Sequence, residues 1–327
     1  MDEVIEYKSN GHPDTLTDNI VEACATALDS YYKKKYGRIL HYNVDKAVFL
    51  AGNADIYYGG GKVTKLPCFI LGGQVSNIDN ELTKTLTRTI KKTIHKYLPN
   101  LKEYLIEIRS NNVSANLSKI CSKNDEMILC NDTSFGVGYY PYSANELTVF
   151  AIADKLNKMI KEQKIPIGEL YKILLTPKTI SISAPLYAQR IHSTLQYAKY
   201  KKEIEKQLSI FGNVIFNPDF ENGFPYLTLI GSSIECGDDG QVGRGNRYNG
   251  LITPCRPMTM EAYYGKNNRN HIGKIYQKWA FEKAKEIYKK TDKYTEVILV
   301  GKIGCPITDY EMYISRRDIN AKRPHKS

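Results

Sequence analysis

Three short polar stretches hold the residue types that chemistry on a triphosphate requires. They occupy residues 10–14, 131–138 and 237–247, and each contains at least one carboxylate and at least one glycine. Carboxylate oxygens bind magnesium, and the arginines of the third stretch can neutralise phosphates. His12 lies just before a predicted helix, where the helix N-terminus attracts anions. As a set, these residues indicate an enzyme that acts on a nucleotide triphosphate.

Each stretch by itself also has a simpler explanation. Asp14 lies at the start of a helix and can cap that helix without binding a metal. His12 can be a solvated loop residue, and a glycine-rich turn can be only a turn. The stretches therefore leave the reaction open.

Hydrophobic spacing predicts the elements that must position these stretches. Glycine and proline end two of the helices, and Ser143 with Glu146 forms a capping box at the start of another. The mixed order, without a dinucleotide or Walker glycine motif, predicts an α+β fold. We expect helices at residues 18–32, 82–98, 143–160, 186–208 and 272–288, and strands at 47–51, 68–71, 180–182, 214–216, 226–230 and 297–300.

The chain is basic, with 46 Lys and Arg against 35 Asp and Glu residues and a formal net charge of +11. Such a charge suits a polyphosphate substrate or a nucleic acid. The basic runs lie in polar helical or terminal stretches, and no run of aromatic residues interleaves with them as a single-strand binding groove would require. We therefore expect solvated faces and no nucleic-acid partner.

The remaining composition indicates a cytoplasmic protein. No apolar stretch approaches the roughly 20 residues that a membrane helix needs, so we expect no membrane partner. The acidic N-terminus does not resemble a signal peptide. The seven cysteines include no C-x-x-C pair, which argues against a disulfide framework or a zinc site. We expect most of them to be small core residues.

The order and spelling of the polar stretches resemble the archaeal-type S-adenosylmethionine synthetases (methionine adenosyltransferases). The similarity runs from about residue 6 to residue 308. The segments that carry it are Gly11-His12-Pro13-Asp14, His41-Tyr42-Asn43-Val44-Asp45-Lys46, Gly59-Gly60-Gly61, Asn131-Asp132-Thr133-Ser134-Phe135-Gly136-Val137-Gly138, Gly237-Asp238-Asp239-Gly240-Gln241-Val242-Gly243-Arg244-Gly245-Asn246-Arg247, Gly265-Lys266-Asn267 and Asn270-His271-Ile272-Gly273-Lys274-Ile275-Tyr276.

The resemblance implies a fold and a reaction. The family fold is α+β, with three similar subdomains around a pseudo-threefold axis. These subdomains are built from discontinuous segments, so residues 1–327 would form one unit. Two subunits would form a homodimer with shared active sites. The substrates would be ATP and L-methionine, and the implied cofactors are Mg2+, as two ions, and K+.

The resemblance also implies roles for individual residues. Asp14 and Asp238 would hold magnesium. His12 would assist the leaving oxygen, and a catalytic group of cations would neutralise the phosphates: Arg244, Lys266 and Lys274. Arg247 would assist them at the phosphates. The methionine and ATP pocket would be lined by Asp132, Thr133, Ser134, Ser114, Asn116, Asp239, Gly243 and Arg247.

One segment departs from the family pattern. Where relatives carry a G-x-G-S-x-D-L sequence, residues 111–117 replace two glycines by Asn111 and Val113 and the aspartate by Asn116. Relatives are also expected to extend further at both ends. Two alternatives therefore stay open: a family member with an altered nucleotide or thioether substrate, and a non-catalytic regulatory subunit. An active enzyme is favoured by the retention of four charged or catalytic residues: His12, Asp14, Asp238 and Arg244.

Overall fold

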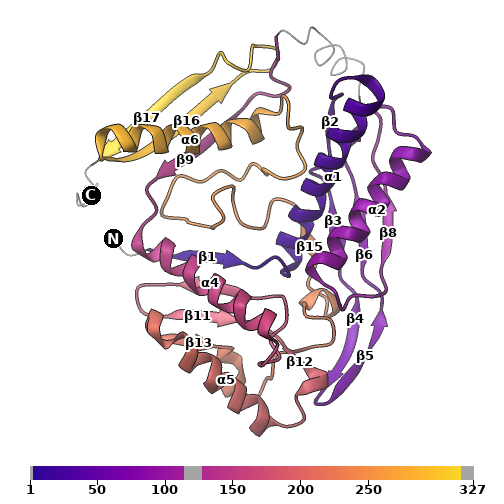
Figure 1. Ribbon diagram of the computed structural model, residues 1–327, viewed down its shortest axis with the longest axis vertical. Coiled ribbons are helices and arrows are strands. Elements are labelled where there is room, and N and C mark those ends of the chain that lie inside the picture. Colours follow the sequence, from indigo (N-terminus) through magenta and orange to yellow (C-terminus); the bar gives the residue numbers. More distant parts are fainter. Residues whose placement is uncertain (1–2, 114–126, 318–327) are drawn as a thin grey trace.

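The three largest β-sheets, each packed against helices, surround the long segment that connects β15 to α6 (Figure 1). This computed structural model describes residues 3–113 and 127–317. Helices and strands are mixed along the chain, and most strand pairs are antiparallel, which confirms the α+β class. The three hydrophobic cores are separate, and each gathers residues from distant parts of the chain.

The first sheet carries the helix that opens the site. Helices α1 (Pro13–Tyr36) and α2 (Asn80–Tyr97) pack together, and Leu16, Ile20 and Phe49 are fully buried in the core that they share with the sheet. Strand order is β15-β3-β6-β8. The strands of this region are β2 (Tyr42–Asn43), β3 (Val48–Leu50), β4 (Asn53–Tyr57), β5 (Gly60–Lys65), β6 (Cys68–Leu71), β7 (Gln74–Val75), β8 (Leu105–Ile108) and β15 (Gly240–Gln241).

The second sheet has the order β1-β10-β11-β13 and packs against α4 (Ala144–Glu162) and α5 (Thr194–Leu208). The predicted capping box is present, because Ser143 Oγ accepts from Glu146 N and Glu146 accepts from Ser143 N. The strands are β1 (Ile5–Lys8), β10 (Lys172–Leu175), β11 (Ile180–Ser183), β12 (Leu186–Tyr187), β13 (Val214–Phe216) and β14 (Leu227–Thr228). Short 3-10 helices occupy Ala188–Arg190, Ser209–Phe211, Pro218–Asn222 and Ser233–Glu235.

Two predictions about this region were wrong in part. The helix expected over residues 186–208 begins only at Thr194, because Ser193 caps it by accepting from Gln196 N. The residues before it pair with β14 instead. The strand expected over residues 226–230 is only the two-residue β14.

The third sheet, of order β17-β16-β9, is covered by α6 (Ile272–Thr291). Its strands are β9 (Ser134–Tyr140), β16 (Tyr294–Gly301) and β17 (Glu311–Arg317). Strand β9 approaches α6 closely through Gly136 and Gly138. A Cβ on Gly138 would overlap the backbone nitrogen of Phe281, so only glycine allows this packing.

The cysteines depart from expectation. Among the six that the structure describes, none forms a disulfide, and only Cys24 and Cys130 are buried. Cys236 is exposed, so the prediction that most are core residues was wrong. No helix within the described residues is long and apolar enough to span a membrane.

We predict that Gly138→Ala destabilises the packing of the third sheet on α6. The added methyl group would force β9 and α6 apart, and overpacking of this kind costs about 1–3 kcal/mol. Thermal unfolding at fixed protein concentration should show a melting temperature several degrees below wild type. The neighbouring Val137→Ala, on the other face of β9, is the matched control and should shift it less. Equal melting temperatures for Gly138→Ala and wild type would contradict this packing argument.

Candidate active site

The site begins at the N-terminus of α1, where His12 is the capping residue. Its Nδ1 accepts a hydrogen bond from Asp14 N at 3.3 Å, and Pro13 occupies the first helical turn. Asp14 therefore lies inside the helix and is not its cap. Because Nδ1 is the acceptor, the hydrogen-bond pattern assigns the imidazole proton to Nε2.

Burial sets the charge of His12. Burial first, and then the nearby Lys8 ammonium, lower the pKa of His12 to about 4, although Asp14 and Asp238 act in the opposite direction. The imidazole is therefore neutral at pH 7 and carries one N–H donor. Because the imidazole is neutral, it forms no ion pair with a nearby carboxylate. Its N–H can therefore donate to an oxyanion at the helix N-terminus.

Asp14 is buried and held on both oxygens. Its Oδ1 accepts from Gln241 N at 3.0 Å, and its Oδ2 accepts from Lys8 Nζ at 2.9 Å. The same ammonium donates to Arg244 O at 2.8 Å. Lys8 thus joins β1, α1 and the 237–247 stretch. Sequence reasoning missed it, because a single lysine in a strand carries no local signal.

The 237–247 stretch brings further charges to the same place. Asp238 is exposed, and its Oδ2 accepts from Ser233 Oγ at 2.7 Å. Asp239 accepts from Ala51 N at 2.7 Å, which ties the stretch to the end of β3. Arg244 is exposed, and within residues 3–113 and 127–317 its guanidinium has no ion-pair partner. It is therefore available to an anionic ligand.

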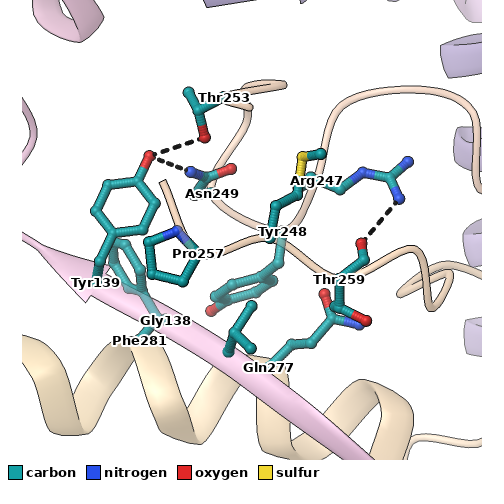
Figure 2. A pocket seen from close by; sticks show the side chains of 12 residues that line it. Gly138, Tyr139, Arg247, Tyr248, Asn249, Thr253, Pro257, Thr259, Gln277 and Phe281 are labelled. Carbon is teal, nitrogen blue, oxygen red and sulfur yellow. Dashed lines mark hydrogen bonds between the residues drawn. The ribbon is translucent and has the colours of Figure 1, made fainter. Parts of the chain in front are cut away.

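Arg247 is used differently. Its guanidinium donates to Gly243 O, to Gly245 O at 2.8 Å and to Thr259 O at 3.4 Å. It thereby braces the loop that carries Arg244. Figure 2 shows Arg247 with Thr259 at the edge of a cavity of about 20 Å³ that has room for only about one water molecule.

Lys266 and Lys274 form a second group of cations, which lies beside a later turn of α1. Lys274 Nζ pairs with Glu22 Oε1 at 2.6 Å and donates to Lys266 O at 3.3 Å. Lys266 is 2% exposed and pairs with Asp45 at 2.6 Å and Glu261 at 2.7 Å. Glu22 is eight residues beyond Asp14, so the two groups are separated by about 12 Å along the helix axis.

Asp132 belongs to the second group. Its carboxylate, that of Glu261 and a ring nitrogen of His271 all lie within 4.8 Å of one another, an arrangement that can hold a metal ion. His271 is buried, and burial followed by Lys266 lowers its pKa to about 3, so the ring is neutral. Sequence reasoning missed Glu261 and His271 as site residues, although His271 lies in a quoted motif.

The other predicted pocket residues are spread out. Thr133 Oγ1 accepts from Ile303 N at 3.1 Å, and Ser134 begins β9. Gly243 has a φ of 82°, and its N–H donates to Asp18 at 2.7 Å. Ser114 and Asn116 lie outside the described residues. The structure therefore brings His12, Asp14, Asp238 and Arg244 together, and brings Asp132, Lys266 and Lys274 together in the second group.

The donor chemistry beside His12 fits magnesium. Asp14 and Asp238 supply only oxygen ligands, and Mg2+ in nucleotide sites takes one or two carboxylates and keeps several waters. Both act electrostatically on His12, and Asp238 is open to solvent. The Asp132 group includes an imidazole, which suits a softer divalent ion better.

Comparison with known proteins identifies the family of this chain. The sequence model of the family described as S-adenosylmethionine synthetase (AdoMet synthetase) matches residues 2–323. The S-adenosylmethionine synthase of Methanosphaera stadtmanae is 36% identical, over 93% of this chain and 83% of that protein. The synthase of Aeropyrum pernix is 35% identical, over 93% and 82%.

A solved structure shares the fold. An S-adenosylmethionine synthetase from Campylobacter jejuni superimposes with a TM-score of 0.64 at 14% sequence identity, covering 95% of this chain and 80% of that one. Taken with the match over residues 2–323, these similarities establish that the chain belongs to the S-adenosylmethionine synthetase family.

Proposed function

We propose that this chain is an S-adenosylmethionine synthetase, which converts ATP, L-methionine and water into S-adenosylmethionine, phosphate and diphosphate. The observation that carries the proposal is the meeting of His12, Asp14, Asp238 and Arg244 at the N-terminus of α1, in a chain whose family match spans residues 2–323.

The first step forms one bond and breaks one. A lone pair of the methionine sulfur attacks C5′ of ATP, and the C5′–O bond breaks with its electron pair on the triphosphate. The thioether has no proton to lose, so the attack needs no general base. The barrier lies in the charge that grows on the departing oxygen, which donors and cations must stabilise.

His12 is suited to that oxygen. A neutral imidazole at a helix N-terminus presents its Nε2 proton as a hydrogen-bond donor, and the helix dipole adds to the attraction for an anion. Arg244 is exposed, and its backbone is held next to Asp14 through Lys8, so its guanidinium is available to the phosphates. Water then cleaves the triphosphate to phosphate and diphosphate within the same group of cations.

We assign magnesium to Asp14 and Asp238. Bound there, Mg2+ would supply positive charge that stabilises the triphosphate as a leaving group. Lys8 already neutralises one oxygen of Asp14, so Asp238 would carry most of the negative charge. Two magnesium ions and a potassium ion are expected from the family and remain proposals for this chain.

Lys266 and Lys274 already have carboxylate partners, which a bound triphosphate would have to share. In the described structure each ammonium is bound by carboxylates, Lys266 by Asp45 and Glu261, and Lys274 by Glu22. Burial lowers the pKa of Lys274, while Glu22 opposes that effect. A triphosphate that engages these lysines must share them with those carboxylates.

A homodimer would complete the site. The sheet faces turned away from the helices carry apolar side chains that are at least 36% exposed in the described structure: Leu50 and Leu105 on the first sheet, and Phe135, Ile298 and Tyr313 on the third. Leu50, Cys68 and Leu105 lie in register across three strands. A second copy packed face to face would bury them.

Two coarser proposals accompany this one. The three cores correspond to three discontinuous subdomains of a single unit, since each core draws on separated segments. We also propose a cytoplasmic location, which the family's substrates favour.

The direct test uses purified protein with ATP, methionine, Mg2+ and K+. We expect the sulfonium product by mass spectrometry, with equal amounts of phosphate and diphosphate, and none of them when ATP is omitted. Parallel reactions with GTP, CTP or ethionine test the altered-substrate alternative that residues 111–116 motivate. Binding of ATP without any turnover would contradict the proposal and favour the regulatory subunit.

We predict that His12→Ala lowers kcat about a hundredfold, which is typical for loss of one positioned donor. His12→Asn is the matched control for folding, since asparagine caps helices well but lacks the imidazole. It should restore stability and leave kcat low. Wild-type turnover by either variant would exclude His12 from the chemistry.

We predict a particle of twice the 37.2 kDa chain mass in analytical ultracentrifugation. The double variant Leu105→Glu/Ile298→Glu should be monomeric and inactive, because buried charges oppose the interface. Leu195→Glu, at an 84% exposed position on α5, should stay dimeric and active. An active wild-type monomer would contradict a shared site.

A further inference from the structure

Asp18 lies one turn beyond Asp14 on α1 and has no role in the reaction described above. It is 0% exposed, and its Oδ1 accepts from Gly243 N at 2.7 Å. Gly245 packs directly on its other oxygen, since a Cβ at Gly245 would overlap Asp18 Oδ2. The backbone on both sides of Arg244 therefore rests on this one carboxyl group.

The spacing of the contacts explains the arrangement. Asp14 and Asp18 are four residues apart on one helix face, which separates them by about 6 Å along the axis. They accept from Gln241 N and Gly243 N, which lie two residues apart in a turn that the hydrogen bond from Arg244 N to Gln241 O closes. Alternate amides of this turn are therefore bound to successive turns of α1.

Arg247 also binds Gly243 and Gly245, through their carbonyl oxygens. Its guanidinium has only hydrogen-bond donors, and it donates to the carbonyl oxygens of both glycines. Burial raises the pKa of Asp18 to about 8, with Gly243 N–H and then Arg247 opposing the rise. A carboxyl group that is neutral at pH 7 still offers its carbonyl oxygen to Gly243, which an amide side chain would also do.

We propose that Asp18 is a positioning residue for Arg244. By binding Gly243 and supporting Gly245, it fixes the backbone of Arg244 next to Asp14, from where the exposed guanidinium would engage a triphosphate group. Asp18 itself touches no substrate. This inference rests on the proposed function, because it assumes that Arg244 engages the phosphates.

The experiment measures binding of inorganic tripolyphosphate with Mg2+ by calorimetry, which needs neither methionine nor turnover. Asp18→Ala should raise its Kd at least tenfold, whereas Asp18→Asn, which retains the acceptor, should stay within about twofold of wild type. Gly245→Ala, whose methyl group displaces the loop from Asp18, should weaken tripolyphosphate binding as much as Asp18→Ala does. It replaces Asp18→Ala in the test if that variant does not fold. Cys24→Ala, buried elsewhere on α1, controls for lost stability and should leave Kd unchanged.

A double-mutant cycle supplies the decisive readout. If Asp18 acts through Arg244, then Asp18→Ala should add less than twofold to Kd in an Arg244→Ala background. Fully additive effects, or wild-type affinity for Asp18→Ala and Gly245→Ala, would overturn the proposal. Failure of the proposed function would be distinct, since wild-type protein would then bind tripolyphosphate yet make no sulfonium product.

Discussion

The site depends on how closely residues 240–247 approach the first two turns of α1. Gly240 lies directly on Pro13, where a Cβ would overlap the Pro13 carbonyl oxygen, and Asn246 exchanges two hydrogen bonds with the backbone of Lys8. No side chain fits between loop and helix at these points. The glycines of this stretch are thus needed to bring Asp238 and Arg244 close to the start of α1. Their role goes beyond forming a turn, which other residues could also do.

Buried charge is the second constraint. Lys8, Lys266 and Lys274 are each at most 9% exposed, and each is matched by at least one carboxylate. Burying an ammonium without a partner costs several kcal/mol, so these pairs preserve the fold more than they add to its stability. They also keep positive charge in fixed positions inside the protein, where an arriving polyanion is attracted more strongly than it would be in water.

Local sequence patterns predicted most helices and strands. They failed where contacts between distant parts of the chain determined the structure. The stripe at residues 82–98 and the capping box at Ser143 gave the correct helices. The helix over residues 186–208 was extended too far because Leu186 fits a helical stripe, although Ser193 and Gln196 mark the true start. The roles of Lys8, Asp18, Glu22 and Asp45 could not be assigned from sequence, because each has a partner more than 200 residues away. Only the motif residues, recognised by their spelling, were assignable in advance.

The discontinuous cores govern how the chain can be made. Ile5 belongs to a core whose strand β10 lies at Lys172–Leu175, and that core also needs Leu251. The first core is closed only by Ile230, Ile234 and Val242. At about 5–20 residues per second on the ribosome, β1 waits roughly 10–30 s before its neighbour in the sheet exists. Fragments that stop before residue 242 leave apolar surface uncovered, so neither of these two units can mature while the chain is still short, and a nascent chain of this kind is a natural client for chaperones.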